Sequence, residues 1–453
     1  MLSKSKYIRG IKCHKNLWLY VNKKEEQQFG EENLMVLSRG TNIGELAQKY
    51  FPNGKLALLL GEIPNNRTAL FTQELIRDGV ETIYEATFIY DNTLVAVDLL
   101  HKENGSWHLY EVKSTNNTKA IHVQDVAVQY YVLKGCGLDI ADASVMHFDR
   151  TYVKKGTIDV RGLFTSDSVL EQILPMQEAI KAKIPELLAM IEEQEPIVEM
   201  GSQCSDPYPC DFCEYCTSLQ PQEEIIGKVL SNVPEVNKPE IKNFLENIEY
   251  PLCHLDFETI MPGVPLFDES RPYQQIPFQY SLHCQGSKSG EIIHFEYLAD
   301  SDLSIDPRKE LIEQMIAQTK EAKTILVYNI SFERTRINEM IRDFPEYSDE
   351  LQLIAVRMMD LMPPFRKDYR TESMEGRYSI KKVLPALCPE LSYHELEIGN
   401  GTDASNAFLE LYYCENKEEI KQTRDHLLKY CHLDTLAMVK VLEVLQKAQA
   451  DFD

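Results

Sequence analysis

Two acidic residues separated by one apolar residue stand in the middle of an apolar stretch. Residues 251–259 read Pro-Leu-Cys-His-Leu-Asp-Phe-Glu-Thr, so Asp256 and Glu258 alternate with Leu255 and Phe257. On a β-strand this alternation sends both acids to one face and the apolar side chains to the other. Two carboxylates held close repel each other unless a cation lies between them, and oxygen ligands favour Mg²⁺ or Mn²⁺. The segment therefore predicts a strand that carries a divalent metal site.

Two later segments supply acids that complete such a site. Residues 324–329 form another apolar run, which predicts a strand, and Glu333 follows it by about one helical turn. A helix predicted over residues 426–446 contains Tyr430 and Asp434, whose i, i+4 spacing puts both on one helical face. We therefore expect two strands and two helical segments to bring four carboxylates together.

In this order the motifs resemble those of the DnaQ-like 3′→5′ exonucleases, in the subgroup whose last motif contains tyrosine. The resemblance implies an RNase H-like sheet and two Mg²⁺ or Mn²⁺ ions, with Tyr430 orienting the attacking water. The chain departs from the family at Glu333, where Asp is usual, so this carboxylate reaches the metals on a longer side chain. The implied metal ligands are Asp256, Glu258, Glu333 and Asp434.

Two positions between these motifs are further candidates. Lys381 stands near the start of a helix that Ser379 is expected to cap, and we predict that its ammonium group contacts a substrate phosphate. A buried strand predicted over residues 353–362 carries Asp360 either to the edge of the site or into a structural contact. The sequence leaves that choice open.

A second acidic pattern stands in the first half of the chain. Alternating apolar residues predict three strands between residues 81 and 113, with Asp98 in the second and Glu111 and Lys113 at the end of the third. An acid buried in a strand is unfavourable unless it is paired or bound to metal. Antiparallel pairing would lay the two carboxylates side by side, and the period of two puts Lys113 on the face of Glu111.

This pattern resembles the RecB-like members of the PD-(D/E)XK nucleases. The resemblance implies that Asp98, Glu111 and the carbonyl group that follows Glu111 hold Mg²⁺, while Lys113 acts on water and on phosphate charge. Gln129, on the helix predicted to follow, matches the glutamine of that family. Glu45 fills the first-motif position, where related enzymes have a histidine followed by an acid.

Cysteines gather in a short segment that follows. Cys204, Cys210, Cys213 and Cys216 are separated by proline and aromatic residues, a pattern typical of a metal centre. Two arrangements fit. All four thiolates could bind Zn²⁺ and leave Cys13 as a buried thiol, or Cys13 could join three of them around a [4Fe–4S] cluster.

The second arrangement resembles the iron-sulfur RecB-like nucleases, including the CRISPR-associated exonuclease family and helicase-nuclease subunits of bacterial recombination. There, one cysteine precedes the nuclease fold and three follow it. Equal spacing selects Cys204, Cys210 and Cys216 as the three. Cys13 is then the fourth ligand, and Cys213 is surplus.

Composition limits the class of protein. The 453 residues are enough for two or three domains, and 43% apolar residues permit ordinary cores. A net charge of −24 argues against non-specific coating of DNA, although a local basic groove still fits a nuclease. The longest apolar run is too short to cross a membrane and the N-terminus lacks a signal-peptide core, so we expect a cytoplasmic protein without membrane contact.

The other cysteines are expected to serve packing alone, because disulfides are rare in cytoplasmic proteins. We expect Cys431 to pack behind Tyr430. The remaining ones are Cys136, Cys253, Cys284, Cys388 and Cys414.

The pattern predicts an α/β protein. A PD-(D/E)XK restriction-endonuclease-like domain with a four-cysteine iron-sulfur cluster is expected at 1–218, a linker at 219–248, and an RNase H-like mixed-sheet domain at 249–453. Helices are expected at 4–21, 41–51, 68–78, 167–193 and 306–322. Strands are expected at 81–90, 94–100, 107–113, 144–150, 278–283 and 292–298, and a flexible turn at 399–403.

These expectations converge on a metal-dependent nuclease that acts on nucleic-acid ends, with 3′→5′ chemistry in the second domain and a second nuclease site in the first. DNA is favoured over RNA because most relatives of the first domain act on DNA, and repair or defence with a helicase or defence-system partner would fit. One alternative is a nucleic-acid-binding scaffold in which one or both sites are inactive. A zinc-stabilised structural protein is another.

Overall fold

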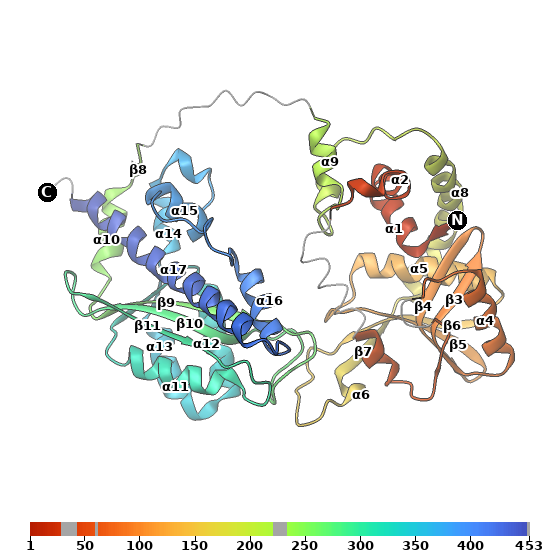
Figure 1. The fold of residues 1–453 in the computed structure, drawn as a ribbon, viewed down its shortest axis with the longest axis horizontal. Coiled ribbons are helices and arrows are strands. Elements are labelled where there is room, and N and C mark those ends of the chain that lie inside the picture. The colour runs from red at the N-terminus through yellow and green to blue at the C-terminus, as the bar shows by residue number, and fades with distance from the viewer. Residues whose placement is uncertain (29–42, 59–61, 221–232, 451–453) are drawn as a thin grey trace. The chain divides into compact units, whose positions relative to one another are not determined.

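The computed structural model describes residues 1–28, 43–58, 62–220 and 233–450 (Figure 1). The chain forms two compact units. Unit 1 comprises Met1–Tyr152 and Gly156–Glu224, and unit 2 comprises Val153–Lys155 and Ile225–Asp453. Each unit packs helices against a sheet with parallel and antiparallel pairs, so the predicted α/β class is confirmed. Among the described residues, no helix has both the length and the apolar character that a membrane crossing requires.

Unit 1 is built on a seven-stranded sheet. Strands β3 (Thr82–Tyr90) and β4 (Thr93–Glu103) form the predicted hairpin across Asp91-Asn92, where both turn residues adopt positive φ (47° and 53°), as a two-residue hairpin turn requires. Six strands follow one another in the order β2 (Lys55–Leu56), β3 (Thr82–Tyr90), β4 (Thr93–Glu103), β5 (Ser106–Val112), β6 (Ile140–Phe148) and β7 (Phe164–Ser168), while β1 (Leu2–Ser3) pairs with β4.

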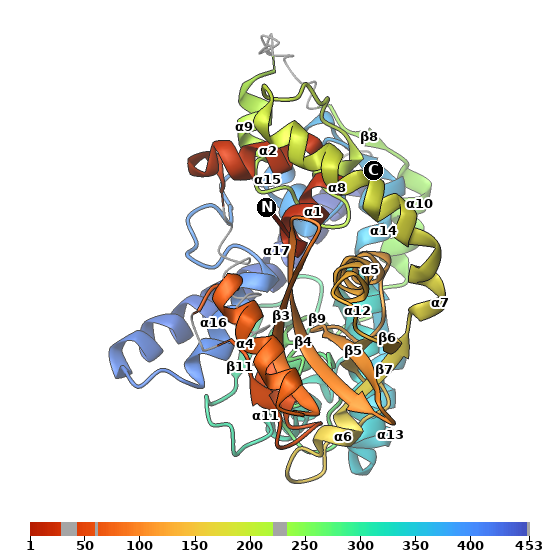
Figure 2. The same ribbon diagram turned by 90° about the vertical axis from the view of Figure 1, so that its right-hand side faces the viewer.

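Helix α5 (Ala120–Gly135) lies across this sheet and contacts β3, β4, β5 and β6 (Figure 2). Residues 43–48 are helical, and the rest of the helix predicted at 41–51 lies partly outside the described residues. The other helices of the unit are α1 (Lys4–Lys12), α2 (His14–Asn22), α4 (Asn66–Arg77), α6 (Val160–Leu163), α7 (Leu170–Ile173), α8 (Gln177–Glu192) and α9 (Cys213–Ser218).

Two helix predictions for unit 1 were wrong in detail. The helix expected at 4–21 is interrupted at Cys13, which has extended backbone geometry (φ −163°, ψ 119°) and links α1 to α2. The helix expected from Asp167 begins later, because Asp167 belongs to strand β7, which pairs with β6. Pairing between distant strands overrides local helical periodicity there.

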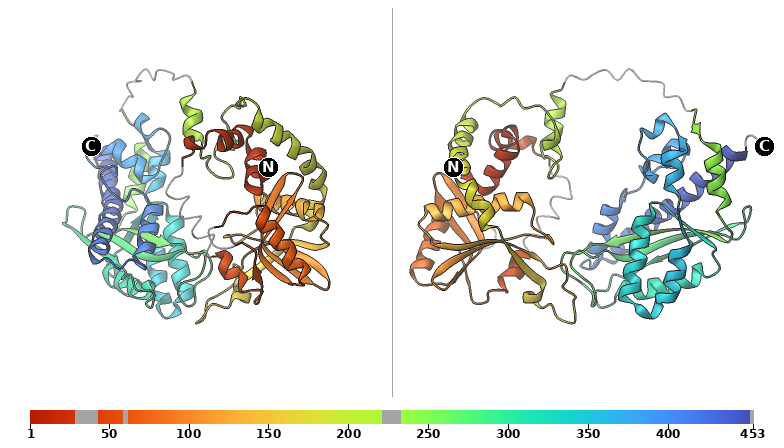
Figure 3. Two further views of the ribbon diagram at one scale, coloured as in Figure 1. Left: turned by 45° about the vertical axis from the view of Figure 1, so that its right-hand side comes forward. Right: turned by 180° about the vertical axis from the view of Figure 1, so that it is seen from behind.

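Unit 2 is built on a five-stranded sheet in which one strand carries both antiparallel and parallel neighbours. Helix α17 (Lys417–Ala450) packs on one face of the sheet and α11 (Pro307–Thr319) on the other (Figure 3). The strand order is β11 (Ile292–Leu298), β10 (Ile276–Gln285), β9 (Leu252–Ile260), β12 (Thr324–Val327) and β13 (Met358–Asp360). The helices used below are α11 (Pro307–Thr319), α12 (Ile330–Asp343), α13 (Ser348–Arg357), α15 (Ile380–Leu387), α16 (Gly401–Leu411) and α17 (Lys417–Ala450).

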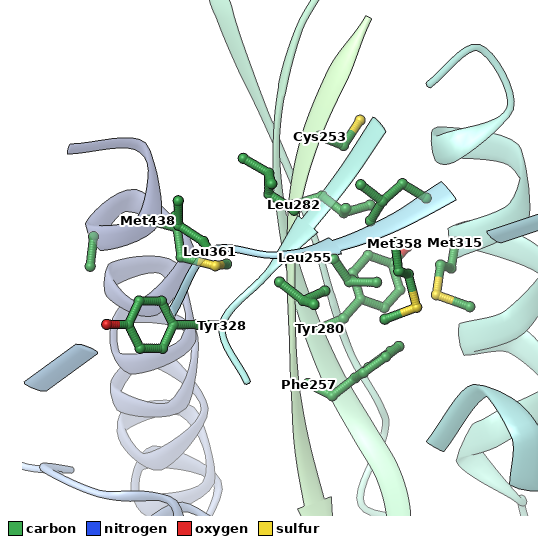
Figure 4. Close-up of a cluster of buried hydrophobic side chains, with 14 of the residues drawn as sticks. Cys253, Leu255, Phe257, Tyr280, Leu282, Met315, Tyr328, Met358, Leu361 and Met438 are labelled. Atoms are coloured by element: carbon green, nitrogen blue, oxygen red, sulfur yellow. The ribbon is translucent and has the colours of Figure 1, made fainter. Parts of the chain in front are cut away.

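The two faces of β9 separate its apolar and acidic residues as predicted. Leu255 and Phe257 are buried on the side where Met315 of α11 packs, whereas Met438 of α17 lies on the opposite side of the strands (Figure 4). Asp256 and Glu258 alternate with the apolar pair and therefore face α17. Because the apolar face of β9 is buried on the α11 side, both acids are positioned beneath α17.

Two predictions for unit 2 were also wrong. Most of the strand expected at 353–362 is the helix α13, in which Leu351 and Ile354 are buried one turn apart; only Met358–Asp360 forms the strand β13. The turn expected at 399–403 instead contains the start of α16, where Asn400 caps the helix by accepting a hydrogen bond from the amide of Asp403.

The expected absence of disulfides also fails, because Cys253 and Cys284 form one. The two residues stand directly opposite each other in the antiparallel β9–β10 ladder. That register depends on tertiary pairing, which residue spacing along the chain does not reveal.

Candidate active sites and cysteine centre

The acids predicted for unit 2 come together from three elements. Strand β9 supplies Asp256 and Glu258, the first turn of α12 supplies Glu333, and α17 supplies Asp434. Glu258, Glu333 and Asp434 are almost fully buried. Asn329 joins β12 to α12 in the left-handed conformation (φ 73°), which asparagine tolerates better than most residues. This sharp turn places Glu333 directly behind the end of the strand.

Mutual repulsion marks these acids as one cluster. Burial, followed by the charges of Asp434, Glu258 and Glu333, holds the pKa of Asp256 well above its ordinary value. Burial and the charge of Asp434 have the same effect on the pKa of Glu258. Burial raises the pKa of Glu333 to about 8 and that of Asp434 to about 6. The metal-free cluster therefore holds protons at neutral pH that isolated carboxyl groups would have released.

The predicted tyrosine and lysine lie in the same site. The ammonium group of Lys381 donates to the Tyr430 hydroxyl at 2.7 Å and to the Gly399 carbonyl at 3.1 Å. Tyr430 also hydrogen-bonds Asp434, and Tyr393 donates to Asp434 Oδ1 at 2.7 Å. The charge of Lys381 lowers the pKa of Asp434 against the larger effect of burial. Tyr393 was not predicted, because nothing local distinguishes it from a core aromatic.

Two more groups border the acids. Cys431 Sγ lies within 4.8 Å of carboxylate oxygens of Asp256 and Glu258, so this cysteine faces the cluster, whereas the sequence predicted that it would pack behind Tyr430. Asp360 takes up both roles left open: it accepts hydrogen bonds from the amides of Asn329 and Met362, and its charge raises the pKa of Glu333.

The predicted acids of unit 1 also meet. Asp98 and Glu111 stand where the β4–β5 ladder ends, beyond its last pair, Leu99 and Tyr110. The amide of Val112 donates to Asp98 Oδ2 at 2.6 Å, so this side chain takes the place of the next strand partner. Burial and the charge of Glu111 hold the pKa of Asp98 well above its ordinary value.

Glu111 is surrounded by donors. Its Oε1 accepts from Lys4 at 2.6 Å and from Lys113 at 2.7 Å, and its Oε2 accepts from Gln129 at 2.6 Å. Lys113 also bonds Asp125 Oδ2 at 2.5 Å. Burial alone would raise the pKa of Glu111, but the charges and hydrogen bonds of the two lysines hold it below its ordinary value. Lys4 and Asp125 complete a network that the sequence did not predict.

The strand beside β4 supplies another acid. The β3–β4 ladder passes from Tyr84–Leu99 to Ala86–Val97 without a change of register, so Glu85 of β3 stands opposite Asp98 at a position with no ladder pair, and it adopts positive φ (53°). Burial and the charge of Glu111 raise the pKa of Glu85, while Lys4 lowers it. Glu45, predicted for the first-motif position, is exposed on the helical segment 43–48. Glu85 is therefore, besides Asp125 of α5, a further acid whose charge acts on this site from outside β4 and β5.

The cysteines form a separate centre in unit 1. One small cavity is lined by Cys13, from the break between α1 and α2, and by cysteines of the segment 204–216. Burial raises the pKa of Cys216, and so do the nearby thiols of Cys210, Cys13 and Cys204. Cys213 also lines the cavity.

A hydrogen-bonded network fixes this segment against α1 and α2. Arg9 donates two bonds to the carboxylate of Asp211, at 2.9 and 2.8 Å. Asn16 donates to Asp211 at 3.1 Å and to Cys210 Sγ at 3.2 Å. The structure thus brings together the four predicted ligands, from opposite ends of unit 1, as unpaired thiols.

Comparison with known proteins finds relatives that have no assigned activity. Residues 253–379 match a family described as a domain of unknown function, DUF2779. The chain is 27% identical over 218 residues to an uncharacterized protein MG366 homolog of Mycoplasma pneumoniae, and 28% identical over 225 residues to the uncharacterized protein MG366 of Mycoplasma genitalium. These matches cover 44% and 45% of this chain and 33% of each relative. The chain thus spans about a third of the length of the curated relatives that it matches.

Proposed function

We propose that the protein is a metal-dependent nuclease that removes nucleotides from the 3′ end of a nucleic acid, with this chemistry in unit 2. The observation that carries the proposal is the convergence of four carboxylates, three of them buried and that of Asp256 partly exposed, beside Tyr430 and Lys381. The mixed sheet and the order of the motifs along the chain support an RNase H-like exonuclease domain of the DnaQ-like type.

The donor set of unit 2 fits Mg²⁺ or Mn²⁺. The ligands would be Asp256, Glu258, Glu333 and Asp434. Glu333 Oε2 is buried without a hydrogen-bond partner, and burial together with the neighbouring acids raises the pKa of Asp256, Glu258 and Glu333, which a bound cation would offset. Bound divalent ions would supply Lewis-acid stabilisation and a reactive water at neutral pH.

The protein side chains would orient the reactants. Lys381 holds the Tyr430 hydroxyl, and Tyr393 holds one oxygen of Asp434, so these groups are positioned before substrate arrives. Tyr430 would orient the attacking water through its hydroxyl group. Lys381 would place a positive charge beside a substrate phosphate.

For unit 1 we propose a PD-(D/E)XK-like site that uses Asp98, Glu111, Lys113 and Gln129, with Glu85 in place of the predicted Glu45. A specific observation favours binding of a nucleic-acid strand over its cleavage at this site. Both oxygens of Glu111 are already engaged by Lys4, Lys113 and Gln129, so a metal ion would have to displace one of them. Unit 1 would then bind a nucleic-acid strand, and unit 2 would cleave it.

For the cysteine centre we propose a [4Fe–4S] cluster held by Cys13, Cys204, Cys210 and Cys216. Four thiolates around one zinc ion stand about 3.8 Å apart, given Zn–S bonds of about 2.3 Å. Within the described part of the chain, no three of these sulfur atoms lie within 4.8 Å of one another. This wider spacing supports a cluster over a single zinc ion, which is the alternative.

The substrate proposed is DNA, in repair or defence, with a helicase or another defence protein as partner. The deciding experiment incubates the full chain with end-labelled single- and double-stranded DNA and RNA in Mg²⁺ or Mn²⁺. We expect stepwise shortening from 3′ ends that Asp434→Asn abolishes and Asp425→Asn, an exposed position on the same helix, does not. Full activity in Asp434→Asn would refute the proposal for unit 2, and equal activity in Asp98→Ala would assign unit 1 a binding role.

A further inference from the structure

Three histidines from separate elements meet on the α17 face of the unit 2 sheet. They are His283 of β10, His294 of β11 and His432 of α17, and one ring nitrogen of each lies within 4.8 Å of the others. The ring centroids are 4.4 to 4.8 Å apart. His283 is buried, and the other two are partly exposed.

Strand register creates this group. His283 stands directly opposite His294 in the antiparallel β10–β11 ladder, and the neighbouring row pairs Ser281 with Glu296. Helix α17 crosses both strands and adds His432. Ser281 is also the partner of Asp256 in the β9–β10 ladder, so the histidines lie on the same face as the acids but farther toward the edge strand β11.

One pair of donor atoms has the separation expected in a tetrahedral transition-metal site. His432 Nδ1 lies 3.3 Å from His294 Nε2. Two imidazole nitrogens that bind the same zinc ion at about 2.0–2.1 Å are separated by about 3.3–3.4 Å. Burial and the neighbouring imidazoles lower the pKa of His283 to about 3, and the same causes lower that of His294 to about 4. Both rings are therefore neutral at physiological pH, the state that binds metal.

Surrounding hydroxyl groups would orient the rings. Thr435 Oγ1 lies 2.8 Å from His283 Nδ1 and donates to the His432 carbonyl at 3.3 Å. A bond from His283 Nδ1 to this hydroxyl would leave Nε2 as the ligand atom, the arrangement typical of metal-binding histidines. Ser281 Oγ contacts Thr435 Oγ1 at 2.6 Å and His294 Nε2, the atom that would bind the metal, at 3.0 Å, so the ion would replace this second contact. Glu296 Oε2 lies 4.0 Å from His294 Nε2.

We propose that His283, His294 and His432 bind one Zn²⁺ ion or a similar divalent transition metal. Imidazole ligands favour such metals, whereas the all-oxygen cluster of the neighbouring acids favours Mg²⁺ or Mn²⁺. The ion would join β10 and β11 to the segment of α17 that also carries Tyr430 and Asp434. Its role is therefore to fix the C-terminal helix on the sheet, and it does not depend on the reaction proposed for unit 2.

The test uses the metal-stripped full chain, titrated with Zn²⁺ and with Co²⁺ in excess Mg²⁺. The variant is His294→Ala, and the matched control is His426→Ala, a histidine of α17 outside the group. Wild type and control should bind one more equivalent of Zn²⁺ than the variant, and Zn²⁺ should raise their melting temperature. Part of the Co²⁺ absorption should disappear in the variant. That part should contain no sulfur charge-transfer bands, which come from Co²⁺ bound at the cysteine centre.

If His294→Ala fails to fold, His294→Gln replaces it, because the amide keeps a hydrogen-bonding group beside Ser281. In His294→Gln we expect the Kd for the Zn²⁺ ion bound by the three histidines to rise at least tenfold. Unchanged zinc stoichiometry, affinity and cobalt spectrum in the folded variant would overturn the proposal. Cleavage activity has no part in this readout, so it stands apart from the outcome for the nuclease.

Discussion

The carboxylate clusters of the two units balance their charge in different ways. In unit 1 two lysines act on the acids, and both bond Glu111 directly, at 2.6 and 2.7 Å. In unit 2 the lysine among the acids, Lys381, bonds Tyr430 and a carbonyl group instead of a carboxylate. As a result the pKa of Glu111 is lowered, although burial raises those of Asp98 and Glu85 beside it, whereas the pKa values of Asp256, Glu258, Glu333 and Asp434 in unit 2 are all raised.

The two clusters differ in how much positive charge the protein itself places beside its buried acids. Protein side chains already supply cations to Glu111, whereas the acids of unit 2 must take up protons or cations from solution. We expect a site of the second kind to bind metal more tightly than a site of the first kind. Four experiments test how the two units differ.

Metal affinity should respond to unit 2 alone. Asp256→Asn keeps the shape of the side chain but removes a charge, and we expect Mn²⁺ to bind at least about 10²-fold more weakly, since even second-shell changes cost 10–100-fold. The matched change in unit 1, Asp98→Asn, should leave Mn²⁺ affinity nearly unchanged. Titration followed by electron paramagnetic resonance measures both, and equal losses would erase the distinction.

The cysteine centre should matter to unit 1 alone. Cys216→Ser should abolish bound iron and sulfide in anaerobically purified protein, whereas Cys213→Ser, three residues away, should keep both. Hydrogen exchange should then rise throughout unit 1 and stay constant in unit 2, because metal binding contributes to the folding energy of the unit that holds it. Zinc without iron in the wild type would contradict the cluster.

The two lysines should differ in their effect on stability. Lys113→Met leaves buried Glu111 and Asp125 without a shared cation, and we expect a loss of about 2–4 kcal/mol, less than for a fully buried pair because Lys113 is partly exposed. Lys381→Met breaks one hydrogen bond to Tyr430 and should cost about 1 kcal/mol. Urea unfolding resolved by hydrogen exchange in each unit measures both losses. A larger loss for Lys381 would reverse the comparison.

The pH dependence of unit 2 should depend on Glu333. Its pKa is about 8 in the folded chain, so from pH 4.5 to 8 the folded state keeps a proton that the unfolded state has released. The free energy of unfolding therefore falls as pH rises through this range. Without divalent ions, Glu333→Gln should remove about 1–2 kcal/mol of that decrease between pH 6 and pH 8. Parallel stability curves for the two proteins would contradict this assignment.

Local periodicity predicted those acids of the two clusters whose motif needs only its own element. The period of two puts Asp256 and Glu258 on one face of β9, and the i, i+4 spacing joins Tyr430 to Asp434. The same reasoning failed where tertiary contacts determine the secondary structure. Asp167 lies in strand β7 instead of a helix, and most of the strand expected before Asp360 is the helix α13.

Residue types and spacings were enough to predict the α/β class, most acids of the two clusters and the cysteines that lie together. The contacts around those acids come from the tertiary structure. Lys4 reaches Glu111 because β1 pairs with the distant β4, Glu85 stands opposite Asp98 through the β3–β4 register, and the three histidines meet through strand register and the crossing of α17. Such contacts join residues far apart in the chain, and no periodicity within one element encodes them.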